Sequence, residues 1–270
     1  MQPQQKAGVV VFGFECTLTL YNMNKELYEN SVENLQNFPL LRINRDVTNN
    51  LKSNFNRPNL LAACFGTPER VGLLNDILTI LRNKKQLELH VVSDSFLPDV
   101  VDALLQVHLL AHFTSVTART QKESGKLFMW RTTLQPNFNR EVFIKNAIAA
   151  AQRPDNTSNV FSNKGEFISS SFKTLQKEQM IYVDSDRTYY SDLQNKCLLL
   201  NIPSQEDVYS DGGANWVDRS SDSFKALSAL NQKTPNNAAL ILAANSNTKT
   251  IERRRASKKV HRESSQCIVL

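Results

Sequence analysis

The chain has few of the residues that mark several protein classes. It contains 8 glycines and 9 prolines among 270 residues, too few for a fibrous or glycine-linker protein. No G-x-G-x-x-G motif follows an apolar run, which argues against a dinucleotide-binding domain. The apolar run Val9–Phe12 is too short for a membrane span or a signal peptide, and residues 1–8 are largely polar, so we expect no secretory signal.

Cysteine is scarce as well. The four cysteines, Cys16, Cys64, Cys197 and Cys267, are scattered and form no C-x-x-C pair. This usage favours a reducing compartment and a protein without a disulfide framework.

Excess charge is missing from most of the chain and gathers near its end. Residues 249–270 hold seven Lys or Arg and two acidic residues, a balance of +5, whereas the other 248 residues hold 25 basic and 24 acidic side chains. A nearly neutral body argues against nucleic-acid binding by the body. The basic tail indicates a negatively charged partner.

What the chain does contain is a series of apolar runs that end in small, polar or acidic residues. The run Val9–Phe12 is typical of a strand buried on both faces of a parallel sheet, and Gly13 and Glu15 follow it. Residues 87–92 and 180–183 indicate two further strands, with others expected at 113–117 and 197–202. Open α/β sheets bind ligands just beyond such strand ends.

Helices are expected between these strands. Thr67 and Pro68 form a good helix start, and apolar residues then recur at helical spacing up to Leu81. A second helix is expected over 98–110, and a third begins near Lys164.

The first strand end resembles the first motif of the haloacid dehalogenase (HAD) superfamily of phosphatases and phosphotransferases. That motif is Asp-x-Asp-Gly-Thr, in which the first Asp is the nucleophile and the second is the general acid/base. In this chain Gly13 stands at the nucleophile position, Glu15 at the acid/base position and Cys16 at the glycine position, and Thr17 matches. Gly13 has no side chain with which to attack a phosphoryl group. Cys16 is not expected to replace it, since nothing in the sequence places a base beside it.

Three further motifs follow in the order that the resemblance implies, and residues 65–71 also resemble a stretch that precedes the second motif. Ser93 stands where the family binds a phosphoryl oxygen, and Lys164 stands where it neutralises phosphate and acidic residues. Asp184 and Asp186 stand where it holds Mg²⁺. Since the carboxylate at position 13 is missing, we expect weak Mg²⁺ binding at most. Glu15, Ser93 and Lys164 would form a degenerate catalytic set.

The order of the motifs predicts an α/β, HAD-like Rossmannoid domain over residues 1–231. It would have a parallel sheet with helices on both faces, and a small cap over 20–60 or no cap. We expect residues 120–158 to be a local excursion of the chain, that is, an insertion within the domain and not a second domain. From residue 232 the composition shifts to Thr, Pro, Asn, Ala and Ser and then to basic residues, which predicts a linker and a disordered polybasic tail. The alternative is another Rossmann-like domain with acids near its strand ends by chance.

The sequence ends in Cys267-Ile268-Val269-Leu270, which resembles a C-a-a-X box for attachment of a geranylgeranyl group to Cys267 by a prenyltransferase. A single lipid anchors reversibly, and each basic side chain at an anionic leaflet adds roughly 1 kcal/mol. The basic residues before the box are Arg253, Arg254, Arg255, Lys258, Lys259 and Arg262. We therefore expect the protein to lie at the cytoplasmic face of a membrane. The alternative is that the basic run is a nuclear localisation signal.

Ser257 lies within this basic run, after Arg254, Arg255 and Ala256. The pattern is typical of a basophilic kinase site. Phosphorylation would add up to −2 of charge and weaken binding to an anionic membrane.

Two functions stay open at this point. The first is a prenylated pseudophosphatase that binds a protein partner or a phosphorylated ligand at the membrane. The second is a Mg²⁺-dependent phosphatase or phosphotransferase that uses Glu15, Ser93, Lys164 and Asp184. A bacterial effector that borrows host prenylation, and so attaches to a host-cell membrane, would carry the same kind of tail.

Overall fold

The structure is a computed structural model. It describes residues 8–20, 61–62, 64–120, 125–131, 159–203, 215–230 and 237–246, with positions 139, 141–142, 145–146 and 149. Its strands are β1 (Val9–Gly13), β2 (Glu88–Phe96), β3 (Ser115–Arg119), β4 (Leu127–Arg131), β5 (Val160–Phe161), β6 (Met180–Asp184) and β7 (Leu198–Asn201). Its helices and short turns are η1 (Phe14–Leu18), α5 (Pro68–Thr79), η3 (Ile80–Lys84), α6 (Leu97–Gln106), η4 (Leu110–His112), α8 (Lys164–Ser171), η6 (Lys177–Gln179), α9 (Tyr190–Leu193) and α11 (Asp222–Ala229).

The described strands form one seven-stranded sheet in the order β5-β4-β3-β2-β1-β6-β7. Five of them are parallel, and β4 and β5 pair antiparallel at one edge. The chain adds β2 and β3 on one side of β1 and later adds β6 and β7 on the other. The strand order therefore reverses at β1, which is where open α/β sheets bind ligands. The prediction of an α/β fold with a mainly parallel sheet is confirmed.

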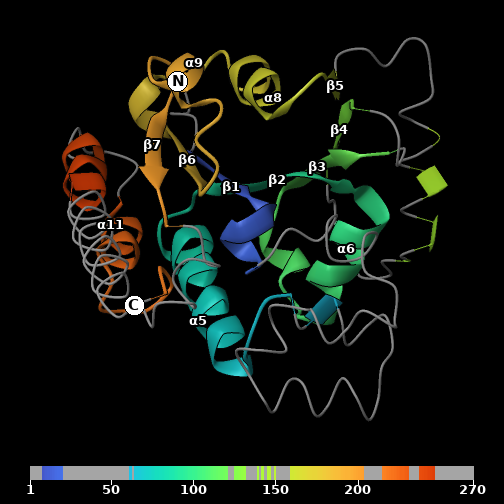
Figure 1. Ribbon diagram of the computed structural model, residues 1–270, viewed down its shortest axis with the longest axis horizontal. Coiled ribbons are helices and arrows are strands. Elements are labelled where there is room, and N and C mark those ends of the chain that lie inside the picture. The colour runs from blue at the N-terminus through green and yellow to red at the C-terminus, as the bar shows by residue number, and fades with distance from the viewer. Residues whose placement is uncertain are drawn as a thin grey trace, which may run out of the picture.

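Helices cover both faces of the sheet, as predicted (Figure 1). Side chains of β1 alternate between two apolar clusters because successive strand residues point to opposite faces. Val10 and Phe12 pack in the cluster that includes α5, α6 and α11, whereas Val9 and Val11 pack in the cluster that includes α8 and α9. The central strand is thus buried on both sides, which explains its unbroken apolar run.

The helix starts follow the capping signals of the sequence. The Thr67 side chain accepts a hydrogen bond from the backbone N–H of Arg70 at 3.3 Å, with Pro68 at the first helical position. Asn163 caps α8 in the same way, accepting from the N–H of Glu166 at 2.9 Å. These caps satisfy N–H groups that have no partner within the helix. The cap on α8 places Lys164 at the end of the helix nearest the sheet's central strands.

The sequence predicted a linker from residue 232. The structure corrects this for residues 237–246, because they form a helix. This helix, red in Figure 1, lies beside β7, where the Asn245 side chain donates to the carbonyl of Leu199 at 2.6 Å and accepts from the N–H of Asn201 at 2.9 Å. Ile241 and Ala244 are buried against the main core. The Asn- and Ala-rich composition resembles a linker, but apolar side chains and one amide bridge attach the segment to the body.

Residues 120–158 contain more of the sheet than expected. Strand β4 lies within them and pairs antiparallel with β3, so the edge of the sheet lies inside the predicted excursion. The predicted cap, from residue 21 to residue 60, and the tail from residue 247 lie outside the described residues.

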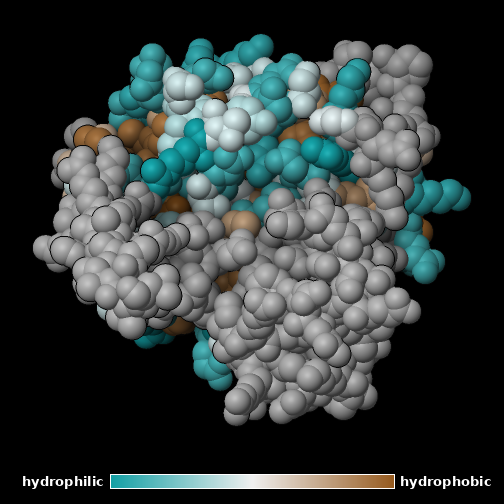
Figure 2. Space-filling view, viewed as in Figure 1, coloured by the Kyte–Doolittle hydropathy of each residue, from teal (hydrophilic) through white to brown (hydrophobic). Residues whose placement is uncertain are grey.

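The described surface is mostly polar on the face shown in Figure 2, with hydrophobic residues at only a few places. Among the described residues, the large hydrophobic side chains that are mainly exposed are Val142 and Leu242. None of the helices in the described part of the chain combines the length and the apolar character that a membrane crossing requires.

Candidate functional site

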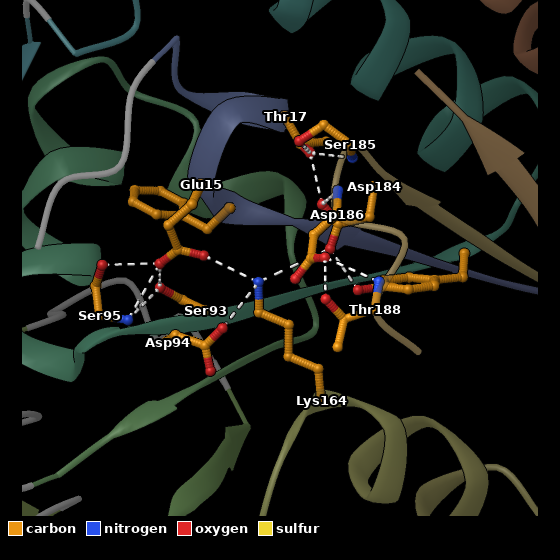
Figure 3. Close-up of polar contacts among 12 residues, drawn as sticks. Glu15, Thr17, Ser93, Asp94, Ser95, Lys164, Asp184, Ser185, Asp186 and Thr188 are labelled. Atoms are coloured by element: carbon orange, nitrogen blue, oxygen red, sulfur yellow. Dashed lines mark hydrogen bonds and ion pairs between the residues drawn. The ribbon is translucent and has the colours of Figure 1, made fainter. Parts of the chain in front are cut away.

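The predicted site residues of the body meet at the carboxyl ends of β1, β2 and β6. Figure 3 shows Glu15 from η1, Ser93 from β2 and Asp184 from β6 arranged around Lys164 of α8. The sheet register pairs Gly13 with Val92, and β6 runs parallel along the other side of β1, which brings the three strand ends together. The structure therefore gathers in one place the residues that the sequence motifs singled out.

The turn η1 carries Glu15 from the end of β1 into this site. Glu15 has extended dihedral angles, and Cys16 then takes a φ of 54°, in the left-handed region. The HAD resemblance puts a glycine at that position, and glycine adopts such angles without steric cost. Phe14 is buried in the core, and its carbonyl accepts the N–H of Thr19 at 3.0 Å, which closes the turn.

Two buried side chains that sequence reasoning missed hold this turn in place. Arg70 of α5 donates to the carbonyl oxygens of Leu18 at 2.7 Å, Phe65 at 2.8 Å and Thr17 at 3.1 Å. The indole N–H of Trp216 donates to the same Thr17 carbonyl at 2.9 Å. The planar guanidinium suits such multiple contacts, because its five N–H donors have a fixed geometry.

A sequence signal for Arg70 did exist. It lies four residues before Leu74, and therefore on the same buried face of α5. A charged residue at a core-facing position indicates a buried polar partner, although the sequence does not identify which one.

The carboxylate of Glu15 is saturated by donors from β2 and α8. Its Oε1 accepts the hydroxyl of Ser93, the hydroxyl of Ser95 at 2.7 Å and the backbone N–H of Ser95 at 3.1 Å. Its Oε2 faces the ammonium of Lys164 at 3.2 Å. The Ser93 hydroxyl, predicted to bind a phosphoryl oxygen, is thus used within the protein.

Lys164 is shared by three carboxylates. Its Nζ lies 3.2 Å from Glu15 Oε2, 3.2 Å from Asp94 Oδ2 and 3.8 Å from Asp184 Oδ2 (Figure 3). The Lys164 side chain is only 3% exposed, so solvent screens these contacts little. Asp94 was not singled out by the motifs, and its place directly after Ser93 was the available signal.

Asp184 is buried and also saturated. Its Oδ1 accepts the Thr17 hydroxyl at 2.9 Å and the N–H of Asp186 at 3.1 Å. Its Oδ2 accepts the hydroxyl of Tyr182 and faces Lys164. Tyr182 and Thr17 therefore share the carboxylate that was predicted to bind a metal ion.

The Asp184 carboxyl also occupies the space beside Gly13. A β-carbon built on Gly13 would overlap the carbon and both oxygens of that carboxyl. Gly13 has a φ of −60° and a ψ of 143°, which any residue can adopt. The restriction at position 13 is thus one of space, and it comes from Asp184.

The electrostatics favour an ionised Glu15 and a charged Lys164. Burial raises the pKa of Glu15, but the Lys164 ammonium and the hydrogen bonds from Ser93 and Ser95 outweigh it, so the pKa lies below its ordinary value. Burial disfavours the Lys164 cation, but Glu15, Asp184 and Asp94 outweigh it and hold the pKa well above its usual range. The pKa of Asp184 is raised because burial exceeds the help of Lys164 and its hydrogen-bond donors.

The predicted Mg²⁺ ligands do not form an open donor set in this arrangement. No group of three or more His, Cys, Asp or Glu side chains able to hold a metal ion is found among the described residues. The oxygens of Asp184 are engaged as above, and Asp186 Oδ1 accepts the N–H of Thr188 at 2.9 Å and its hydroxyl at 2.6 Å. The donors present do not fit a divalent cation, and Mg²⁺ binding stays an untested prediction.

The remaining predicted residues lie outside the described part of the chain. They are the lipidation residue Cys267, the phosphorylation residue Ser257 and the six basic residues of the tail. The catalytic roles assigned to Glu15, Ser93 and Lys164 also stay predictions.

Comparisons with known proteins add little. No protein-family model matches the chain, and no curated protein matches it in sequence. Among solved structures, the chain is similar to one described as a phospho-aspartyl intermediate analogue of phosphoserine phosphatase. The identity is 14%, the TM-score is 0.33, and the match covers 77% of this chain and 91% of that chain.

Proposed function

We propose that this chain is a catalytically impaired protein with a HAD-like phosphatase framework, which acts at a membrane as a lipid-anchored binding or regulatory protein. One observation carries the first half of this proposal. Position 13, where the resemblance requires a nucleophilic carboxylate, has no side chain, and the space beside it is filled by Asp184. A nucleophile can be neither supplied there nor added without moving a second residue.

The other polar groups of the site support the same proposal. Glu15 could still accept a proton, but Ser93, Ser95 and Lys164 already use the lone pairs of its carboxylate. A general base must reach the proton that it abstracts. The network satisfies its own members, as a structural network does, and it leaves a substrate few donors or acceptors.

The charge of the site favours a protein partner over a phosphorylated ligand. Glu15, Asp94 and Asp184 carry three formal negative charges, and Lys164 and Arg119, which lies 4.0 Å from Asp94, carry two positive ones. A phosphate dianion would be repelled by the excess of carboxylates. Lys164, the cation predicted to neutralise phosphate, is already shared among those carboxylates.

The membrane half of the proposal is supported by the sequence of the tail. The described body has few exposed large apolar side chains, so attachment would depend on a lipid at Cys267 and on the basic run. Mass spectrometry of the protein from eukaryotic cells should find a geranylgeranyl group on Cys267. Cys267→Ser should move the protein from the membrane fraction to the cytosol, and an unchanged distribution would refute lipid anchoring.

The test of catalytic impairment is phosphate release from a panel of phosphorylated metabolites with Mg²⁺. We expect no turnover by the wild-type chain or by Gly13→Asp, because Asp184 blocks the restored side chain. Turnover by the wild type that Asp184→Asn abolishes would overturn the proposal and imply a different nucleophile.

A further inference from the structure

We propose that the Lys164 ammonium is the resident counter-ion of this site and takes the place of a divalent metal ion. The site would then be complete without metal, and its three carboxylates would be held together by a side chain of the protein. The inference rests on the proposed function only in treating this site as a binding or structural one.

The distances around Lys164 suit an ammonium ion. Its Nζ lies 3.2 Å from an oxygen of Glu15 and of Asp94, and 3.8 Å from an oxygen of Asp184. Charge-assisted N–H···O contacts are made at about 3 Å, whereas Mg²⁺ requires oxygens at about 2.0–2.1 Å in near-octahedral geometry. A Mg²⁺ ion placed where Nζ lies would be too far from all three oxygens to coordinate them directly.

The lone pairs that face away from Lys164 are used by other donors. Glu15 Oε1 accepts three hydrogen bonds from Ser93 and Ser95, and Asp184 Oδ1 accepts two, from Thr17 and Asp186. The other oxygen of each carboxylate faces the ammonium, and that of Asp184 also accepts the hydroxyl of Tyr182. This division of each carboxylate indicates a site built around one cation, and that cation is Lys164.

Removal of the ammonium should convert the site into a metal site. Without Lys164, the buried carboxylates of Glu15 and Asp184 and the partly exposed carboxylate of Asp94 would lose the cation that offsets their mutual repulsion. A hydrated divalent cation could relieve that repulsion. In the wild-type chain the ammonium already relieves this repulsion, so Mg²⁺ should not raise its stability.

The experiment is thermal unfolding of the full chain in about 10 mM MgCl₂ and in NaCl of equal ionic strength. We compare the wild type, Lys164→Met and Lys173→Met, in which an exposed lysine near the end of α8 is changed as the control. Mg²⁺ should leave the melting temperatures of wild type and Lys173→Met unchanged. It should raise that of Lys164→Met by about 5 °C, as a cation bound well above its Kd would.

Two results would overturn the inference. One is a rise in the wild-type melting temperature with Mg²⁺ as large as that in Lys164→Met. The other is no effect of Mg²⁺ on Lys164→Met. Where Lys164→Met is unfolded in NaCl, recovery of the native circular dichroism spectrum on refolding in Mg²⁺ supports the inference, and no recovery counts against it.

Phosphate release separates this inference from the proposed function. A wild-type chain that released phosphate in EDTA would refute catalytic impairment and leave the resident counter-ion in place. A silent wild-type chain that Mg²⁺ stabilised would refute the counter-ion and leave catalytic impairment in place.

Discussion

A β-carbon on Gly13 and the carboxyl group of Asp184 cannot occupy the site together in the present packing. The two residues come from adjacent strands, β1 and β6, and they stand at positions to which the HAD resemblance assigns the nucleophile and a metal ligand. A side chain at position 13 therefore requires a second change, the displacement of the Asp184 carboxyl group. Substitution of Gly13 alone would not place a carboxylate there without that displacement.

The first prediction is that Gly13→Ala destabilises the fold. The backbone angles of Gly13 suit alanine, so the cost should come from overlap with Asp184 and amount to about 1–3 kcal/mol of unfolding free energy, measured by urea titration. Gly72→Ala, at an exposed position in α5 with no atom near the added carbon, should instead stabilise by about 1 kcal/mol. In an Asp184→Gly background the cost of Gly13→Ala should disappear, and its persistence there would mean that another group fills the space.

The second prediction concerns the clamp on η1. Arg70→Met removes the donors to the carbonyls of Thr17, Leu18 and Phe65, and should lower the unfolding free energy by about 3 kcal/mol, since buried acceptors lose their partners. Arg219→Met is the matched control, because Arg219 is 71% exposed and pairs with Asp76 at the surface. That pair should contribute at most about 1 kcal/mol. Equal losses in the two variants would refute the clamp.

Much of the fold was predictable from local patterns. Strands β1, β2 and β6 are central and parallel, so their burial on both faces leaves continuous apolar runs such as Val9–Phe12. The starts of α5 and α8 were predictable because Thr67 and Asn163 cap their own helices through local hydrogen bonds. The strand ends carry the motif residues, and parallel strands bring such ends to one edge of the sheet.

The features that escaped prediction depend on contacts between distant segments. The role of Trp216 follows from one hydrogen bond to Thr17, far away in the sequence. The helix over 237–246 has the composition of a linker and is identified only by its packing against β7. Asp184 fills the space beside Gly13, and predicting this would have required the relative positions of β1 and β6 at atomic detail.

The third prediction is a specific acid dependence of stability. The folded pKa of Glu15 is lowered, so its contribution is present above the unfolded pKa of about 4.3 and is lost as the pH falls through the folded pKa. Asp184, whose folded pKa is raised, has the opposite sign and favours the folded state at low pH. Glu15→Gln should therefore flatten the fall in melting temperature below about pH 4.5, and Asp184→Asn should make it steeper.

Lys164 sets the alkaline behaviour. Its folded pKa is raised, so its contribution is full below the unfolded pKa of about 10.4 and is lost only as the pH rises through the still higher folded value. Stability from the ammonium should hence persist to pH 10.

The outcome that would contradict the acid prediction concerns Glu15. If the melting temperatures of wild type and Glu15→Gln fall in parallel as the pH is lowered, Glu15 is not ion-paired as described.

The last prediction concerns the tail, which lies outside the described residues. Ser257→Glu adds a negative charge inside the basic run, and one unit of charge at an anionic leaflet is worth about 1 kcal/mol, so binding of the lipidated chain to phosphatidylserine vesicles should weaken by about fivefold. Ser191→Glu adds the same charge at an exposed position of α9 and should leave binding unchanged. The difference between the two variants should shrink as salt is added, because counter-ions screen the leaflet. Ser257→Glu binding as tightly as the wild type at low salt would rule out a phosphorylation switch in this segment.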